Sequence, residues 1–490
     1  KYDNVNLMDF QRIDELHDIG YNRTISMMDS IKSRIHRRVN LDNIRLRRMV
    51  YRSNFPELRF KNIIIDGANP QQQAYMKKEF HKSDNKEFTY EDLKQGYFRL
   101  LSDKMISEII PHAIYNPEDD TYDLHLKVKL ENNFAVRLGG NISTSNSNQI
   151  YLGLSYQDLN YYAKEFILDG QLGKVYNNVQ FMAKIDFATA IPTSYRLIGS
   201  ISTFDYFKKD KLFSRNNKPA FNQKDERFSK LQVGLPFLSS KRAEFGVGIA
   251  RIEDKYFQKS VIDFGNDKFD KSRYDLFGGS ISFNGSTLNS KQYPTRGYRE
   301  ALVAQIFVGK ERFYPGEGST TSNNKDHHSW LQLSYMKEKY HNMSEHWVLG
   351  WYLKALYASK NFSENYTATM MQAGEFSPTL HSKLTYNEAF RANQFVGAGI
   401  RPIYRLSQMF HLRGEFYGFM PIYPIEKNSL NKAYYGKAFS KFEYLGEISV
   451  VCQLPFGDIS AYVNHYSSPK REWNVGLSIG LQLFNYRFIE

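Results

Sequence analysis

The sequence predicts a mostly β chain, in which an antiparallel transmembrane β-barrel of about 16 strands follows one small α+β domain and a helical N-terminal segment. Three observations lead to this fold class. Aromatic residues make up 15% of the chain, and most of them are Tyr (35) or Phe (36). No stretch approaches the roughly 18 to 20 consecutive apolar residues that a membrane-spanning helix needs. Apolar and polar side chains alternate with a period of two through residues 131–490.

This alternation reconciles a membrane location with a low mean hydropathy. Barrel strands carry apolar residues toward lipid and polar residues toward the lumen, and aromatic residues gather at the two interfaces. One strand of a soluble sandwich or propeller shows the same alternation, so composition alone leaves that alternative open. The repetition of the pattern over residues 131–490 favours the barrel.

Residues 1–52 are predicted to be helical and basic. Phe10, Ile13 and Leu16 share one apolar face, and apolar residues continue at helical spacing as far as Ile35. The arginine-rich run that follows predicts a solvated helix face and a linker rather than a dedicated binding site.

Residues 53–130 are predicted to form a compact unit with the order β-α-α-β-β. Thr89 and Asp92 have the spacing of an N-cap at the start of the second helix. The sequence Asn-Pro-Glu-Asp-Asp at 116–120 is a turn signal that joins the last two strands.

The barrel is assigned to residues 131–490, where about ten residues per tilted strand predict roughly 16 strands. In the final strand, apolar residues from Val475 to Leu483 alternate with small and polar ones. We expect this strand to close the barrel, with Phe484, Tyr486 and Phe488 as an interfacial aromatic cluster.

Two polar tracts within the barrel are too long for hairpin turns. They are Gly316–His328 and Asn361–Leu384, and both are predicted to be outward-facing loops.

A specific motif lies between two predicted strands, at Tyr293-Pro294-Thr295-Arg296-Gly297. The proline fixes φ, the threonine can bond to the backbone, and the glycine accepts a positive φ. The β-α-α-β-β unit, this motif and the barrel together resemble a POTRA domain plus the surface-antigen barrel of the BamA-like assembly and secretion superfamily. That resemblance implies an outer-membrane barrel with a periplasmic domain.

The superfamily also carries an Arg-Gly-aromatic motif on an inward-folded loop, where the Arg pairs with an acidic residue inside the barrel. Phe390-Arg391-Ala392 resembles a degenerate version of it. Arg391 is therefore a candidate lumen anchor, with an ordinary arginine of the barrel wall as the alternative. The departure from the motif counts against a typical insertase or two-partner secretion pore.

The N-terminal sequence, including Asp14-Glu15-Leu16 and Ile19-Gly20-Tyr21, resembles the last helix of a patatin-like phospholipase domain. A patatin domain, one POTRA domain and a 16-stranded barrel are combined in PlpD-like (type Vd) autotransporters, here of the Bacteroidota form. The resemblance implies that the chain anchors a serine lipid acyl hydrolase whose catalytic domain lies upstream. The alternative is a non-enzymatic assembly or secretion pore that receives clients through its POTRA domain.

No catalytic site is expected within the chain itself. A patatin enzyme needs Gly-x-Ser-x-Gly, and the nearest sequence, at 278–282, lies in a predicted barrel strand. Asp66-Gly67-Ala68 resembles the acid motif, but a strand-to-helix turn needs glycine for its backbone alone. His327 and His328 in a polar tract indicate solvated side chains rather than a metal site. We expect no cofactor and no metal.

The formal net charge of +13 is spread along the whole chain, so nucleic acid is not an expected partner. We expect the chain to lie in the bacterial outer membrane, with its N-terminal part in the periplasm, and to meet membrane lipids and lipopolysaccharide. A homodimer through the barrel wall and partners from the periplasm or the assembly machinery are further expectations. A plain diffusion porin ranks last, and Cys452 is expected to be an ordinary buried cysteine.

Overall fold

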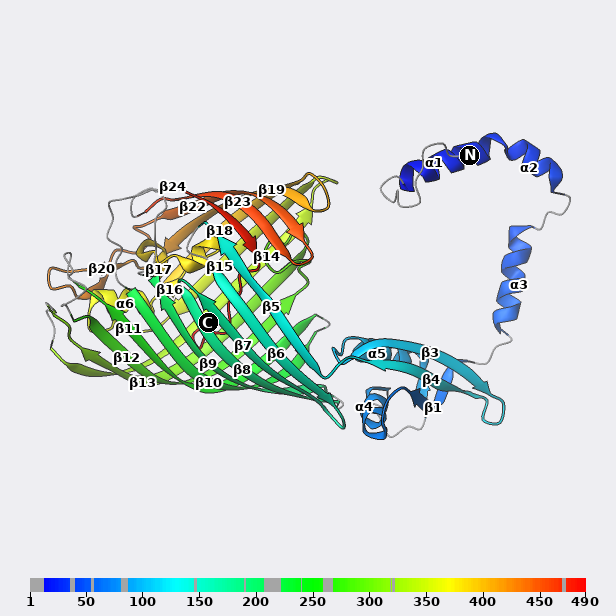
Figure 1. Ribbon diagram of the computed structural model, residues 1–490, viewed down its shortest axis with the longest axis horizontal. Coiled ribbons are helices and arrows are strands. Elements are labelled where there is room, and N and C mark those ends of the chain that lie inside the picture. Colours follow the sequence, from blue (N-terminus) through cyan, green and yellow to red (C-terminus); the bar gives the residue numbers. More distant parts are fainter. Residues whose placement is uncertain are drawn as a thin grey trace.

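A computed structural model describes most of the chain (Figure 1). The described residues are 13–35, 40–53, 57–80, 87–144, 148–188, 191–206, 222–238, 240–258, 268–317, 319, 322–468 and 473–490. Among them, every helix is too short or too polar to cross a membrane.

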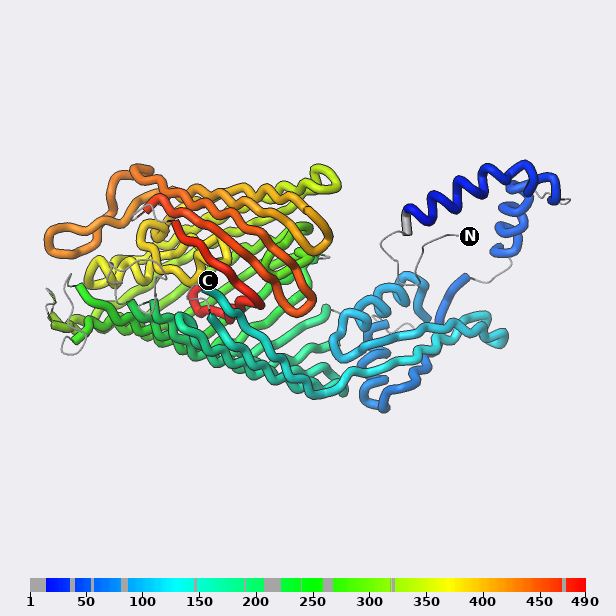
Figure 2. The backbone as a smooth tube through the Cα atoms, turned by 45° about the horizontal axis from the view of Figure 1, so that its top comes forward, coloured from blue at the N-terminus to red at the C-terminus, as the bar shows by residue number. Residues whose placement is uncertain are grey.

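The described part of the N-terminal segment is helical, as predicted, and contains α1 (Ile13–Ser26), α2 (Met28–Arg34) and α3 (Leu41–Ser53). Neither α2 nor α3 has a buried residue. In Figures 1 and 2 these helices extend away from the rest of the chain. Phe10, which we assigned to the apolar face of the first helix, lies outside the described residues.

The small domain has a four-stranded sheet with two helices. Its elements are β1 (Arg59–Asp66), α4 (Pro70–Phe80), β2 (Phe88–Thr89), α5 (Tyr90–Leu101), β3 (Ile106–Asn116) and β4 (Thr121–Leu130). The strand order is β2-β1-β4-β3, and the short β2 is an addition to the predicted order. The predicted N-cap is confirmed, because Thr89 and Asp92 form a reciprocal capping box.

Sixteen of the later strands in the described residues close into an antiparallel barrel, as predicted. They are β5 (Phe134–Ser143), β6 (Gln149–Leu159), β7 (Ala163–Gly173), β8 (Tyr176–Phe187), β9 (Thr193–Asp205), β10 (Asn222–Phe237), β11 (Lys241–Tyr256), β12 (Asp270–Ser286), β13 (Gly297–Tyr314), β14 (Asn324–Asn342), β15 (Trp347–Ala358), β18 (Gln394–Arg405), β19 (Phe410–Pro421), β22 (Glu443–Leu454), β23 (Gly457–Tyr466) and β24 (Trp473–Gly480).

Side chains on the barrel strands alternate between the outer wall and the lumen. On β24, Val475, Leu477 and Ile479 are exposed on the outer wall, whereas Ser478 is buried. Cys452 was expected to be buried, but it is partly exposed.

The prediction of outward loops is wrong for Asn361–Leu384 and for the last five residues of Gly316–His328. Asn324–His328 belongs to β14, whose inward-facing His328 is buried. Most side chains of Asn361–Leu384 are buried or half-buried rather than solvated, because the segment after β15 folds back into the barrel. Figure 1 shows its short elements within the barrel outline.

The prediction that the final strand reaches Leu483 and is followed by an interfacial aromatic cluster is also wrong. The last strand stops at Gly480, where φ is +119°, and the remaining residues leave the wall. Phe488, predicted to lie in an interfacial cluster, is 2% exposed and packs in the lumen with Phe228 and Phe307. The alternation of apolar and polar residues therefore continues beyond Gly480, although the strand itself ends there.

Candidate functional site

The first and last barrel strands meet in an unusually short seam. Among the described residues, β24 and β5 have three residue pairs in register, from Ser478↔Ser143 to Gly480↔Asn141. The adjacent pairings, β5 with β6 and β23 with β24, each have eight. Two further backbone hydrogen bonds lengthen the seam slightly, from Thr144 N to Leu477 O and from Leu481 N to Gly140 O.

Below this seam, one edge of β5 is open. Residues 134–139 pair with β6 on one side, but no described strand pairs with their other side. Phe134, Val136 and Leu138 point outward and are 58%, 54% and 81% exposed. The edge therefore offers unpaired backbone N–H and C=O groups beside apolar side chains, which is the arrangement that accepts an added strand.

Gly480 sets the point at which the last strand turns away from β5. A Cβ on this residue would lie 2.2 Å from the carbonyl oxygen of Gly140. The positive φ and this close approach both require glycine. The open edge thus follows from a backbone turn that one residue type permits.

After Gly480 the chain crosses the lumen to the opposite wall. The Phe488 amide donates to Glu226 on β10 (2.6 Å), and the Phe488 carbonyl accepts from Gln305 on β13 (3.1 Å). The carboxylate of Glu490 lies 3.2 Å from the Lys230 ammonium. The tail is therefore fixed at its far end by polar bonds and by the burial of one aromatic ring.

A second inward segment, residues 359–393, also fills the lumen. It contains α6 (Tyr366–Gln372), β16 (Gly374–Glu375), two 3-10 turns (His381–Leu384 and Glu388–Phe390) and β17 (Arg391–Ala392).

Arg391 lies in this segment and not in the barrel wall. Its Nη2 is 2.9 Å from Glu375 Oε2, and its Nη1 donates to the carbonyl of Ala373 at 3.3 Å. The guanidinium also lies over the Tyr386 ring, 4.7 Å from the ring centre. These contacts hold β17 against the rest of the inward segment.

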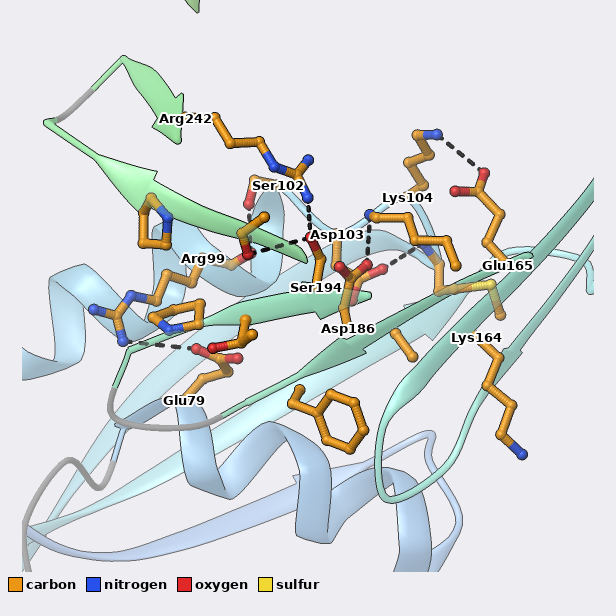
Figure 3. A pocket seen from close by; sticks show the side chains of 18 of the residues that line it. Glu79, Arg99, Ser102, Asp103, Lys104, Lys164, Glu165, Asp186, Ser194 and Arg242 are labelled. Atoms are coloured by element: carbon orange, nitrogen blue, oxygen red, sulfur yellow. Dashed lines mark hydrogen bonds and ion pairs between the residues drawn. The ribbon is translucent and has the colours of Figure 1, made fainter. Parts of the chain in front are cut away.

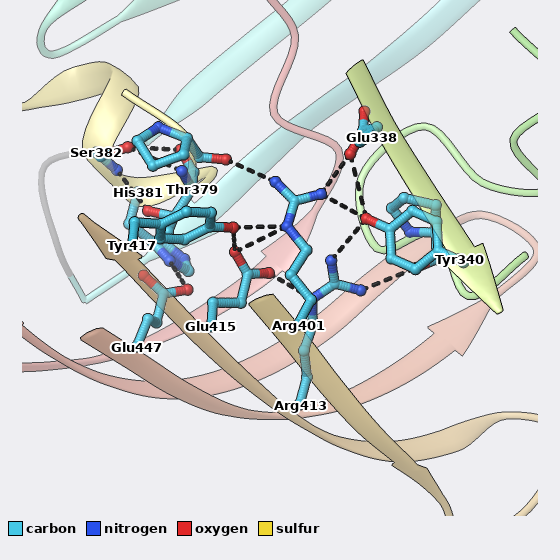
Figure 4. A network of polar contacts seen from close by, with 12 residues as sticks. Glu338, Tyr340, Thr379, His381, Ser382, Arg401, Arg413, Glu415, Tyr417 and Glu447 are labelled. Atoms are coloured by element: carbon cyan, nitrogen blue, oxygen red, sulfur yellow. Dashed lines mark hydrogen bonds and ion pairs between the residues drawn. The ribbon is translucent and has the colours of Figure 1, made fainter. Parts of the chain in front are cut away.

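A buried network of charges connects the wall to the lumen (Figure 4). Arg401 on β18 pairs with Glu338 on β14, and its Nη2 donates to the Pro378 carbonyl of the inward segment at 3.2 Å. Arg413 on β19 pairs with Glu415 and donates to Tyr340 Oη at 3.0 Å. Each charge has an opposite partner, which is the condition for tolerating buried ions.

The 293–297 motif is part of the same assembly. Gly297 has φ +95°, as the motif predicted. Tyr293 Oη donates to Ser460 Oγ at 3.0 Å, and the Pro294 carbonyl accepts from Arg413 at 2.8 Å. The Thr295 hydroxyl accepts from the side chain of Asn289 rather than bonding to the backbone.

The turn that carries this motif also contacts the end of the last strand. Gln292 Nε2 donates to the Gly480 carbonyl at 3.0 Å, and Gln292 Oε1 accepts from the Gln482 amide at 2.9 Å. The turn before β13 therefore supports the point where β24 leaves the seam, although the two are far apart in sequence.

The small domain meets the barrel at a polar pocket of about 420 Å³ (Figure 3). Lys104 Nζ lies 3.0 Å from Glu165 on β7, and Leu159 at the end of β6 joins the apolar core of the small domain. Tyr75 Oη donates to Asp103 at 3.0 Å. Burial, reinforced by the nearby charge of Asp103, raises the pKa of Tyr75 above its usual value.

The residues considered for catalysis do not come together. Asp66-Gly67-Ala68 lies at the end of β1, where a Cβ on Gly67 would be 2.1 Å from a backbone oxygen. Residues 278–282 lie in the barrel wall on β12. His328 bonds to Glu311 at 2.8 Å, and the part of the chain that the structure describes contains no group of three or more residues suited to a metal.

Sequence reasoning missed the seam, the buried network and the contact of Gln292. Arg401, Arg413 and Glu415 occupy lumen-facing positions of their strands, so charge at alternate positions was the available signal for the network. The seam had no such signal, because its length depends on the turn at Gly480 and on the end of β5 at Ser143, which lie far apart in the sequence.

The chain is similar in structure to two solved outer-membrane barrels. BamA from Haemophilus ducreyi, solved without POTRA domains 1-3, superposes with a TM-score of 0.56 and 12% identity, over 86% of this chain and 84% of that one. CdiB from Acinetobacter baumannii gives a TM-score of 0.50 and 9% identity, over 87% of this chain and 74% of that one. No family model and no curated protein matches the sequence. At these identities the likeness establishes the fold, a closed barrel of the BamA type.

Proposed function

We propose that the chain is an outer-membrane barrel that accepts a β-strand of a client polypeptide at the open edge of β5 and guides it into or across the membrane. The observation that carries this proposal is the short seam, which leaves residues 134–139 without a partner strand among the described residues. A strand that paired there would satisfy the free backbone groups, whose exposure in lipid is costly.

The outer wall supports a membrane location. Large apolar residues are exposed around the barrel, among them Leu172, Ile249, Ile306 and Val475. A soluble protein rarely exposes so many, whereas lipid would cover them. On this proposal the small domain is a POTRA domain in the periplasm, placed beside the entrance of β5 to deliver clients.

The filled lumen argues against a diffusion porin. The tail 481–490 and the segment 359–393 both cross the interior, and on this proposal the pairing of Arg391 with Glu375 anchors the second of them. A client strand would therefore pass along the seam and not through an open pore.

The experiment that tests this proposal locks the seam. Ser143→Cys and Ser478→Cys are placed at a pair in register, in a background with Cys452→Ser. The variant is reconstituted into liposomes, and a urea-denatured eight-stranded outer-membrane barrel serves as the probe. We expect the oxidised protein to lose the acceleration of probe folding, and reduction to restore it. Full activity of the oxidised protein would refute strand acceptance at this edge.

A matched control locks a continuous part of the wall. Ser155→Cys with Ile167→Cys joins β6 to β7 at another pair in register. Oxidation of this control should leave probe folding unchanged, because no strand enters between β6 and β7.

A second candidate function is the anchoring of a patatin-type lipid acyl hydrolase. The observation that favours it is the exposure of apolar residues on the N-terminal helices, including Leu41 (70%), Leu46 (60%) and Met49 (66%). Such faces normally pack against another domain. Intact mass spectrometry of the protein from native outer membranes tests it. A mass above 57.3 kDa by a hydrolase-sized domain supports the anchor, and a mass of 57.3 kDa counts against it.

A further inference from the structure

One charged row crosses the outer wall of the barrel. Arg227, Arg251, Asp275 and Lys310 are neighbours in register on β10, β11, β12 and β13. All four side chains are exposed or half-buried, on the faces of their strands that point away from the lumen. The row lies toward the end of the barrel opposite the small domain, since β10 and β12 begin at that end (Figure 1).

A hollow in the apolar wall lies directly beside this row. Its volume is about 890 Å³, and its apolar lining includes Phe181, Ile249 and Phe277. The hollow exists because the next register row contains two small residues, Gly199 and Ser229, between larger ones. A Cβ on Gly199 would meet nothing within 4 Å, so the space is open and suited to a hydrocarbon chain.

The charges around the hollow are not balanced. Among outward-facing residues of the charged row and the two rows beyond it, eight are cations: Arg227, Arg251, Lys255, Lys271, Arg273, Lys310, Arg312 and Lys325. Four are acids, of which Asp205 lies on β9 at the edge of the outermost row. The other three each already have a cation: Asp225 with Lys255 (2.8 Å), Glu253 with Arg273 (2.6 Å) and Asp275 with Arg251 (2.7 Å).

Arg227 and Lys310 are the cations next to the hollow that lack an acidic partner among the described residues. They lie at the upper limit of the apolar wall, because the exposed apolar residues below them on the same strands begin at Leu231 and Val308. An unpaired cation at this depth is stabilised when a lipid phosphate lies beside it.

We propose that this surface binds a glycolipid with two phosphates, of the lipid A class, from the outer leaflet. An acyl chain occupies the hollow, and the two phosphates meet Arg227 and Lys310. The spacing favours this ligand over an ordinary phospholipid. Three strand spacings separate the two cations, which is about 14 Å at ~4.8 Å per strand. A disaccharide that carries a phosphate at each end spans this distance while both side chains stand away from the wall, whereas a single phosphate would require both side chains to bend along the wall toward each other.

The proposal rests on the outer-membrane location proposed above but not on strand acceptance at the seam. The hollow lies on β8 to β13, away from β24 and β5 in the barrel order. The two ideas can therefore fail separately.

The test compares lipid retained by the full chain and by an Arg227→Gln, Lys310→Gln variant. Each is incorporated into nanodiscs that contain either lipid A or phosphatidylglycerol as the anionic lipid, then extracted and studied by native mass spectrometry. We expect lipid A bound to the variant to fall roughly 10- to 30-fold. Phosphatidylglycerol should bind weakly to both proteins.

Two further variants make the result specific. Lys432→Gln with Lys437→Gln removes the same charge from exposed lysines elsewhere on the barrel and should retain lipid A. Gly199→Leu fills the hollow and should reduce lipid A binding while both cations remain. Unchanged binding by the Arg227/Lys310 variant, or equal binding of phosphatidylglycerol and lipid A, would overturn the proposal. Probe folding in the liposome assay should be unaffected by all of these changes, which separates this site from the seam.

Discussion

The seam and the wall opposite it are the two extremes of one barrel. At the seam, β24 has 8 residues and shares three pairs with β5. Across the barrel, β14 has 19 residues and shares 17 pairs with β13. Each net backbone hydrogen bond contributes about 1 kcal/mol, so the seam is many kcal/mol weaker than the wall. The comparison indicates that the barrel wall can open only between β24 and β5, because every other pair of neighbouring barrel strands shares more residue pairs.

The largest effect is expected in the buried network of charges, which connects the long-paired wall to the inward segment. Arg401→Met leaves Glu338 without its main partner and should lower the free energy of unfolding by about 3 to 5 kcal/mol. Urea titration of the folded barrel on unheated gels measures this loss.

The control for this prediction is an exposed pair in the small domain. Lys61→Met removes the 2.8 Å contact with Asp119 and should cost far less, because water screens an exposed ion pair. An equal loss in both variants would show that burial of the network has no special weight.

The next effect concerns the tail, which connects the seam to the opposite wall. Phe488→Ala removes a ring that packs with Phe228 and Phe307, at a cost of about 3 kcal/mol. The tail should then leave the lumen, and ion conductance in planar bilayers should rise. Tyr486→Ala, in the same tail but 45% exposed, should change conductance little.

A smaller effect tests the turn that shortens the seam. Gly480→Ala forces a side chain into a backbone with positive φ and should lower the free energy of unfolding by about 1 to 3 kcal/mol. Thermal unfolding followed by circular dichroism measures the change. Gly279→Ala, where the nearest atom would be 3.4 Å away, is the control. If the two variants unfold alike, the seam does not depend on glycine.

The smallest effect separates the small domain from the barrel. Burial raises the pKa of Tyr75 above its usual value near 10, so the neutral phenol is favoured in the folded state. The stability linked to this group is complete below pH 10 and is lost as the pH rises above it. The small domain should therefore lose stability as the pH rises above 10. Tyr75→Phe should weaken this pH dependence, as near-ultraviolet circular dichroism can show.

Local signals predicted much of this fold. The period-two alternation indicated barrel strands, and the length of the region at about ten residues per strand gave their number. The spacing of Thr89 and Asp92 gave the helix start, because a capping box depends on neighbours in sequence. The glycine of the 293–297 motif also adopts the expected backbone.

Contacts between distant residues were not predictable in this way. The polar tract 361–384 has the composition of a surface loop, and it is buried because Arg391, Arg401 and other lumen groups satisfy it. The alternation after Gly480 matches a strand, but β5 no longer runs beside it. In both cases the structure of the segment depends on which distant residues contact it, and the sequence pattern of one segment does not show which residues those are.

The fixed tail has a practical consequence for labelling. Glu490 lies within the barrel, where its amide donates to Gln305 and its backbone carbonyl accepts from Gln332. A fluorophore or affinity peptide joined after this residue would start its path in the interior and displace those bonds. Reagents directed at such a tag would measure how freely molecules enter the barrel. A label that reports exposure at the cell surface would have to be attached at another position.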